Sequence, residues 1–140
     1  MFSGQPQRNN RVRIGMVSSI VAEKALVRVK FEDNDSVSSE LPVLFAQTVN
    51  GKYFSLPAVG ERVLCLFLSD DASAGFCLGA FYTDANPPPP SAIHQQGVWF
   101  PDGSHVFYDA TSGELHLKAN SKVIIEGDLQ VTGRVTEGGG

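Results

Sequence analysis

The chain has 140 residues and a formal net charge of −4, with 42% apolar and 19% charged residues. This length favours one domain, or one small domain with an appendage, and the apolar content excludes a wholly disordered chain. No apolar run approaches the roughly 20 residues that span a bilayer. Residues 1–15 also lack the apolar stretch of a secretory signal. Export by the general pathway is therefore not expected.

Charge is unevenly distributed along the chain. Residues 1–30 carry six basic side chains and one acidic one, whereas residues 31–85 carry eight acids and two bases. A basic head on an acidic body is typical of a nucleic-acid arm, or of a segment that docks on an acidic partner. The basic excess is small for a nucleic-acid footprint. Residues 1–10 are interpreted as an N-terminal arm, with both kinds of partner left open.

A run of four prolines, Pro87–Pro90, interrupts the chain. Consecutive prolines cannot continue a helix or the interior of a sheet, and they stiffen a segment into an extended polyproline conformation. We therefore expect a linker over residues 86–97. It separates a first domain at residues 11–85 from a second one at residues 98–140.

Residues 11–85 are predicted to form short strands. Within residues 25–31, apolar side chains alternate with Arg28 and Lys30, as in a strand with one buried face. Asn50-Gly51, between two apolar runs, is a strong signal for a hairpin. Five short strands favour a small closed barrel of the OB-fold type. They are expected at Val12–Ile20, Ala25–Phe31, Leu41–Val49, Arg62–Leu68 and Gly75–Tyr82.

Residues 98–140 are more repetitive. Glu114–Lys118 alternates strictly, with Leu115 and Leu117 on one face, and short apolar runs with glycine corners follow it. A tail this short is near the lower limit for folding alone, and its strands lack a second layer within the chain. We therefore predict that other copies supply that layer, in an intertwined trimeric β-helix or β-prism. The predicted fold class is all-β throughout.

An aromatic segment opens this tail. Phe100–Ser104 has the composition of a tight turn, with a proline and a glycine inside it. Trp99 precedes the turn, and Val106-Phe107-Tyr108 follows it. We interpret the segment as a hairpin that starts the β-helix and plugs its wide end. The alternative is an aromatic platform for a ligand.

The histidines are the first candidates for chemistry. His94, His105 and His116 recur every eleven residues, a spacing that could bring one imidazole per chain to a threefold axis. His116 lies between two leucines, however, and points outward if those leucines are core, while His94 lies in the linker. Ser104 is merely adjacent to His105, and neither a nucleophile elbow nor a phosphate-binding glycine loop is present.

The cysteines and acidic pairs have simpler interpretations. Cys65 and Cys77 lie in apolar surroundings and are read as small buried side chains of a reduced protein. Their spacing does not match a zinc site. Asp33/Asp35 and Asp70-Asp71 lie in turn segments, where aspartate favours local backbone hydrogen bonds. We therefore predict no catalytic, cofactor-binding or metal-binding residue, and no enzyme activity.

The order of these segments resembles a known family. Arg13–Val17, Val27–Val29 and Glu40–Val43 come first, followed by Pro57–Val63 and Gly75–Tyr82. The stretch Pro57-Ala58-Val59-Gly60-Glu61-Arg62-Val63 is the most specific of them. Together they resemble the baseplate assembly protein V family, the central spikes of contractile-tailed, Mu-like phages. The resemblance covers about residues 11–135, and it lies in the order of the segments rather than in one diagnostic motif.

The resemblance implies a homotrimer with an OB-fold collar and a β-helical needle that pierces the host envelope when the sheath contracts. Implied partners are the tail hub and baseplate wedge proteins, which the basic residues 8–13 would dock, and the host outer membrane. The implied location is the tail baseplate of the virion, assembled in the host cytoplasm. Needles of this family often end in an inward His-x-His that binds iron. The motif is absent here, so no iron is expected, and a separate tip protein is one explanation.

Two other functions remain as alternatives. An OB barrel can bind single-stranded nucleic acid on aromatic side chains, but the net charge of −4 disfavours contact with a polyanion, and no nucleic-acid partner is expected. A small trimeric β-enzyme or a binding module like that of a tail fibre would need a polar pocket, which the sequence does not indicate.

Overall fold

The computed structural model describes residues 11–90 and 92–138, so the predicted arm of residues 1–10 lies outside the described residues. The chain divides into two compact units, Met1–Pro87 and Pro88–Gly140. Among the described residues, no helix is long and apolar enough to cross a membrane. Within residues 11–90 and 92–138 the regular structure is β apart from two short 3₁₀ helices, η1 (Ala22–Lys24) and η2 (Ala92–His94).

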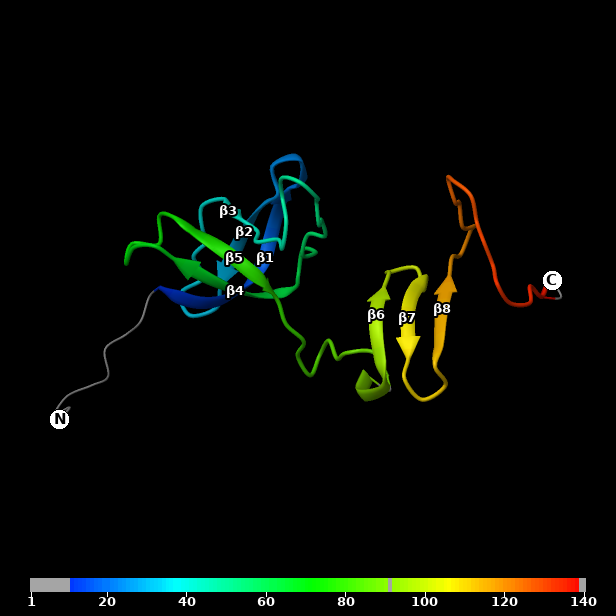
Figure 1. Ribbon diagram of the computed structural model, residues 1–140. Helices are drawn as coiled ribbons and strands as arrows, with labels where there is room; N and C mark the ends of the chain where they lie inside the picture. Colours follow the sequence, from blue (N-terminus) through cyan, green and yellow to red (C-terminus); the bar gives the residue numbers. More distant parts are fainter. Residues whose placement is uncertain (1–10, 91, 139–140) are drawn as a thin grey trace, which may run out of the picture. The chain divides into compact units, whose positions relative to one another are not determined.

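The first unit is a small barrel built from one antiparallel sheet (Figure 1). The strand order is β3-β2-β1-β4-β5. A parallel bridge between Val43 and Cys77 joins the two ends of the sheet, and the Leu44 amide donates to the Cys77 carbonyl at 3.1 Å. The strands are β1 (Val12–Val21), β2 (Leu26–Phe31), β3 (Leu41–Pro42), β4 (Arg62–Phe67) and β5 (Gly75–Ala80).

Side chains that alternate to the inner face of each strand fill the core of this barrel. Val27, Val29 and Phe31 are fully buried, whereas Arg28 and Lys30 between them point outward, which confirms the alternation predicted for β2. Phe31 meets Phe67 of β4 edge-on, with ring centroids 5.7 Å apart. Most of the remaining core is aliphatic, and its other members are Val17, Leu41, Val43, Val63, Cys65 and Cys77.

The long strand β1 pairs with a different strand along each of its two edges. It pairs with β2 along one edge and with β4 along the other, and a register shift between Val17 and Ser19 lets it bend. Gly15 lies where β1 and β2 approach closely, since a Cβ there would meet Val29 Cγ1 at 2.5 Å and the Lys30 carbonyl oxygen at 2.6 Å. The absence of a side chain at Gly15 therefore permits the close approach of β1 and β2.

The third strand is much shorter than predicted. Only Leu41–Pro42 pairs with β2, and the chain beyond it forms bends as far as residue 51 rather than a strand reaching Val49. The hairpin predicted at Asn50-Gly51 is wrong, because no strand ladder flanks it. The loop is spanned by the Tyr53 amide, which donates to the Gln47 carbonyl at 3.2 Å, and by the Lys52 ammonium, which donates to the Thr48 carbonyl at 3.2 Å. Here Phe45 packs against the core and stacks on Phe54, with centroids 5.7 Å apart, which takes the place of strand pairing.

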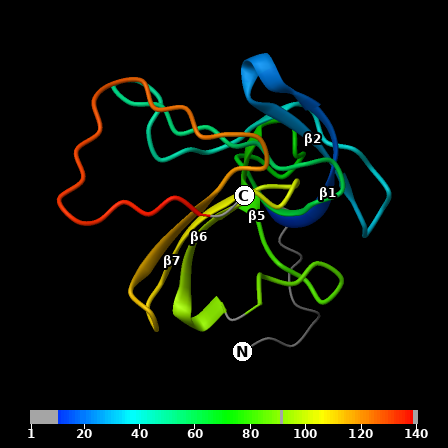
Figure 2. The same ribbon diagram turned by 90° about the vertical axis from the view of Figure 1, so that its right-hand side faces the viewer.

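The second unit begins with a three-stranded antiparallel sheet in the order β6-β7-β8, seen from two directions in Figures 1 and 2. Its strands are β6 (Gln95–Trp99), β7 (His105–Asp109) and β8 (Glu114–Lys118). The predicted strand at Glu114–Lys118 is confirmed. Residues 119–138 form no strand in the single chain, so the predicted strands there, which need a second layer from other copies, stay a prediction.

Candidate functional site

The sheet of the second unit has one apolar face. Strand pairing sets Val98, Val106 and Leu117 in one row, and Tyr108 beside Leu115 in the next. All five side chains are exposed, Leu115 to 70%. Because side chains alternate across a sheet, this single face collects nearly all the aliphatic residues of the three strands. An uncovered apolar sheet face of this kind marks an interaction surface.

The opposite face carries a stack of rings that spans all three strands. Trp99 of β6 stacks on Phe107 of β7 with centroids 5.5 Å apart, and Phe107 stacks on His116 of β8 at 4.8 Å. His105 tilts against Phe107 at 4.9 Å. Gly97 lies opposite Phe107, where a Cβ would collide with the Phe107 backbone. The prediction that His116 faces away from Leu115 and Leu117 is confirmed.

The turn between β6 and β7 is the one predicted at Phe100–Ser104. The Phe100 amide donates to the Ser104 carbonyl at 2.8 Å, and Gly103 has a φ of +92°, a conformation that glycine adopts freely. The Ser104 amide donates to the Asp102 carboxylate at 2.9 Å, and this bond holds the pKa of Asp102 below its ordinary value. Asn120 binds back to Asp102 and Ser104, which ties the start of the tail to the turn.

The tail after β8 is apolar but uncovered. Ile124 is 70% exposed and Leu129 is 71% exposed. The other large aliphatic side chains of this segment, Val123, Ile125, Val131 and Val135, are exposed as well. The tail therefore continues the uncovered apolar surface of β6–β8 along the chain.

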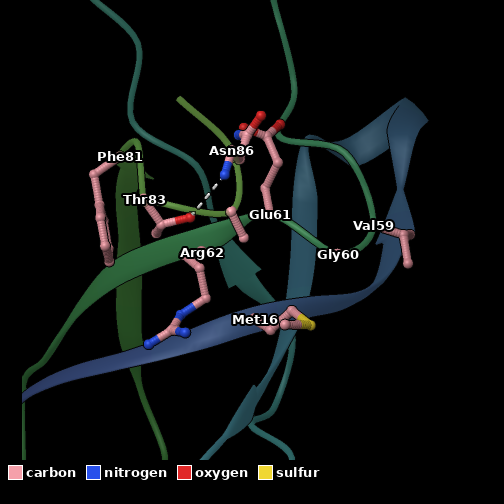
Figure 3. A pocket seen from close by; sticks show the side chains of 9 residues that line it. Met16, Val59, Gly60, Glu61, Arg62, Phe81, Thr83 and Asn86 are labelled. Carbon is pink, nitrogen blue, oxygen red and sulfur yellow. Dashed lines mark hydrogen bonds between the residues drawn. The ribbon is translucent and has the colours of Figure 1, made fainter. Parts of the chain in front are cut away.

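A depression lies on the barrel close to the start of the linker (Figure 3). Its volume is about 390 Å³, and Met16, Val59 and Phe81 provide its apolar lining. Asn86 donates from its backbone amide to the Thr83 hydroxyl at 3.2 Å on one side of it. Among the described residues that line this depression, no nucleophile is paired with a base.

Five basic side chains of the barrel lie in ion pairs with acidic ones. The shortest join Arg13 to Asp33 and Arg62 to Glu32, each at 2.7 Å. Further pairs are Arg11–Asp70, Arg28–Glu40 and Lys30–Asp35. Phosphate binding depends on cations that can neutralise the backbone of the nucleic acid. These pairs neutralise most of the basic side chains in residues 11–87, which argues against the nucleic-acid alternative.

Arg13 has a structural role that the sequence did not indicate. It belongs to β1, its side chain is only 14% exposed, and its guanidinium lies 3.8 Å from the centroid of the Phe31 ring. The resemblance implied that residues 8–13 form a docking segment. Arg13 is engaged with Asp33 and Phe31 of its own barrel. Residues 8–10 lie outside the described residues, and docking by this segment stays a prediction.

The other candidate residues lie apart from one another. His94 is exposed on η2, and His105 and His116 belong to the ring stack. Asp71 accepts hydrogen bonds from Ser69 and Ser73, as predicted for an aspartate in a turn, and these bonds lower its pKa. In the part of the chain that the structure describes, no three His, Cys, Asp or Glu side chains gather as a metal site would require. The predicted absence of catalytic and metal residues stays a prediction.

A nearly closed five-stranded barrel, followed by a second unit with a three-stranded antiparallel sheet, defines a small OB-fold protein with surfaces suited to assembly. The family model of the type VI secretion system/phage-baseplate injector OB domain matches residues 13–82, half of the chain. The chain therefore belongs to this family, which confirms the resemblance to baseplate assembly protein V. No match was found among curated proteins. Membership gives the chain a structural, spike-related role in a baseplate.

Proposed function

We propose that the chain is the central spike of a contractile tail and acts as a homotrimer. Three OB barrels, residues 11–85, form a collar that caps the tail tube beneath the hub. The linker predicted at residues 86–97 is shorter than expected, since β6 already begins at Gln95. It connects each barrel to a needle in which the second units of the three copies intertwine as a β-helix. The needle leads when the sheath contracts and punctures the host envelope.

The observation that carries this proposal is the uncovered apolar surface of the second unit. Val98, Val106, Tyr108, Leu115 and Leu117 share one sheet face without a covering layer from the described residues of their own chain. Burying a valine or leucine side chain contributes roughly 1.5–3 kcal/mol. Three copies that turn these faces toward one axis would bury all of them at once, which supports a threefold assembly.

A puncturing role suits such an assembly mechanically. The outer strands β6 and β8 each have an unpaired edge within the described chain, and exposed edges are where sheets fray or pair with other chains. In the trimer, strands from neighbouring copies cover these edges, so the needle resists load without a metal or disulfide. No His-x-His is present in the sequence, and the proposal therefore includes no apical iron.

The mass of the protein in solution tests the proposal. The full chain of 15.0 kDa is expected to form a species of three times that mass by light scattering. A variant ending at Asn86 keeps the barrel and is expected to be of lower order. A monomeric full chain would overturn the proposed spike, and salt-sensitive binding of a single-stranded oligonucleotide by that monomer would favour the alternative function.

A further inference from the structure

Two cysteines face each other inside the barrel. Cys65 of β4 and Cys77 of β5 are direct partners across the antiparallel pair, and both are fully buried. Both are free thiols in this structure. Burial alone accounts for a cysteine as a small apolar side chain, but direct pairing on neighbouring strands adds a second possibility.

The hydrogen bonds of the sheet define the kind of pair they form. The Leu68 amide donates to the Ala74 carbonyl at 2.8 Å, so residues 68 and 74 are a hydrogen-bonded pair. Hydrogen-bonded and non-hydrogen-bonded pairs alternate along an antiparallel ladder. Counting along the printed register by three positions, from 68/74 to Cys65/Cys77, therefore gives a non-hydrogen-bonded pair.

Bonds on the far sides of both strands agree with this assignment. The Cys77 carbonyl accepts from Leu44 at 3.1 Å, which directs it away from β4. Likewise the Phe67 amide donates to the Arg11 carbonyl at 2.6 Å, away from β5. Cys65, two residues before Phe67, has its backbone groups pointing the same way, because the direction repeats every second residue.

A non-hydrogen-bonded pair brings its two residues close together. Opposed Cα atoms in such a pair are about 4.5 Å apart, at the lower end of the roughly 4.4–6.8 Å range found for disulfides. The two side chains point to the same face of the sheet, into the core. A register shift next to the pair, between Leu64 and Cys65, gives β5 local freedom to adjust.

The thiols also interact electrostatically. A hydrogen bond between them lowers the pKa of Cys77 to about 7 and raises the pKa of Cys65. This hydrogen bond places the two sulfur atoms next to each other in the closed barrel, as the strand register also requires.

We infer that Cys65 and Cys77 are the site of an intrachain disulfide, formed when the folded protein meets a small-molecule disulfide such as oxidised glutathione. The Cys77 thiolate attacks one glutathione sulfur and releases the first glutathione as thiolate, leaving a mixed disulfide. Cys65 then loses its proton to solvent and attacks the Cys77 sulfur, releasing the second. Two protein thiols are oxidised, and one oxidised glutathione becomes two reduced ones.

The disulfide would stabilise the barrel where the two ends of its sheet meet. β5 closes the sheet through the contact of Cys77 with the segment after β3, and the disulfide fixes β5 to β4 at that same residue. Because both thiols are buried, exchange requires β4 and β5 to separate briefly. Oxidation is accordingly slow in the folded protein and faster in mild denaturant.

The experiment incubates the reduced full chain with oxidised glutathione, with and without urea at its unfolding midpoint, and then refolds it. Thiols are afterwards alkylated with N-ethylmaleimide in full denaturant and the chain is weighed by mass spectrometry. The expected product has lost about two mass units, takes up no maleimide, and refolds to the solution mass of the reduced protein. Its urea midpoint is expected to rise by on the order of 1 M.

Three results would overturn the inference: two alkylated thiols per chain after oxidation in urea, disulfides only between chains, or an oxidised chain that no longer refolds. Cys65→Ala and Cys77→Ala are matched controls, since each retains a single thiol and takes up maleimide or one glutathione. The disulfide test and the trimer test fail independently. The disulfide is detected from the mass and maleimide uptake of the single chain, whereas the trimer is detected from the mass of the reduced protein in solution.

Discussion

At the scale of single residues, Arg13 packs its mostly buried side chain against Phe31 of the barrel core. Its guanidinium covers the Phe31 ring and bonds Asp33, so one side chain provides a cation–π contact, an ion pair and the packing of its aliphatic stem. Arg28 differs, because its ion pair with Glu40 is 3.5 Å long and both side chains are more than 40% exposed. Exposed pairs of that kind contribute little to stability.

Replacing Arg13 is therefore expected to destabilise the barrel more than replacing Arg28. Arg13→Ala should lower the free energy of unfolding by roughly 1–2 kcal/mol, whereas Arg28→Ala should change it by about 0.5 kcal/mol or less. Urea titration of each full-length variant measures both. Equal effects of the two substitutions would contradict the role assigned to Arg13.

Asp102 gives the second unit a dependence on pH. The Ser104 backbone amide, with smaller contributions from the Ser104 and Asn120 side chains, lowers its pKa from the ordinary 3.8. A carboxyl whose pKa is lower in the folded state stabilises it at pH values above the ordinary pKa. That stabilisation is lost as the pH falls through the folded-state pKa.

The hairpin is thus expected to loosen in acid below about pH 4, and Asp102→Asn should reduce this acid sensitivity because an amide oxygen still accepts the bonds but takes up no proton. Trp99, the only tryptophan, adjoins the turn and reports on it by fluorescence. Asp84→Asn, in the other unit, serves as the control. An acid transition unchanged by Asp102→Asn would rule out this carboxylate as its source.

At the scale of elements, β8 presents different chemistry on its two faces. Leu117 lies on the exposed apolar face, while Lys118 lies beside the ring stack on the other. In a single chain both side chains are exposed, so neither substitution disturbs a packed core. Only contact with another copy distinguishes them.

Leu117→Lys is expected to weaken the trimer, because three charged side chains would be brought into an apolar interface at a cost of several kcal/mol. Lys118→Ala should leave assembly unchanged. Sedimentation velocity over a range of concentrations compares the two variants with the parent chain. A Leu117→Lys protein that assembles as well as the parent would show that this face is not the interface.

Strands could be predicted where buried and exposed side chains alternate along the sequence. They could not be predicted where side-chain packing, rather than the residues of a turn, decides the course of the chain. Val27, Val29 and Phe31 identified β2 because one side of it is core. Asn50-Gly51 failed because a favourable turn makes a hairpin only if flanking strands pair, and the stacked Phe45 and Phe54 occupy that position. The ring stack could not be anticipated, since it depends on the register of three strands.

For the whole molecule, the two units differ in how much of their stability lies within one chain. The barrel encloses its own core, and the family match of residues 13–82 falls on it. The second unit leaves its apolar face and tail exposed, with Val135 at 73%. A segment that cannot bury its apolar side chains alone acquires its structure from partners, and here the proposed partners are two further copies.

Hydrogen exchange of the amides in residues 121–135 tests this claim most directly. These residues form no strand within the single chain, so any protection must come from pairing with other copies. The trimer is expected to slow their exchange by at least about a thousandfold relative to the unstructured rate. Exchange of these amides at the unprotected rate, in full-length protein at high concentration, would contradict an intertwined needle.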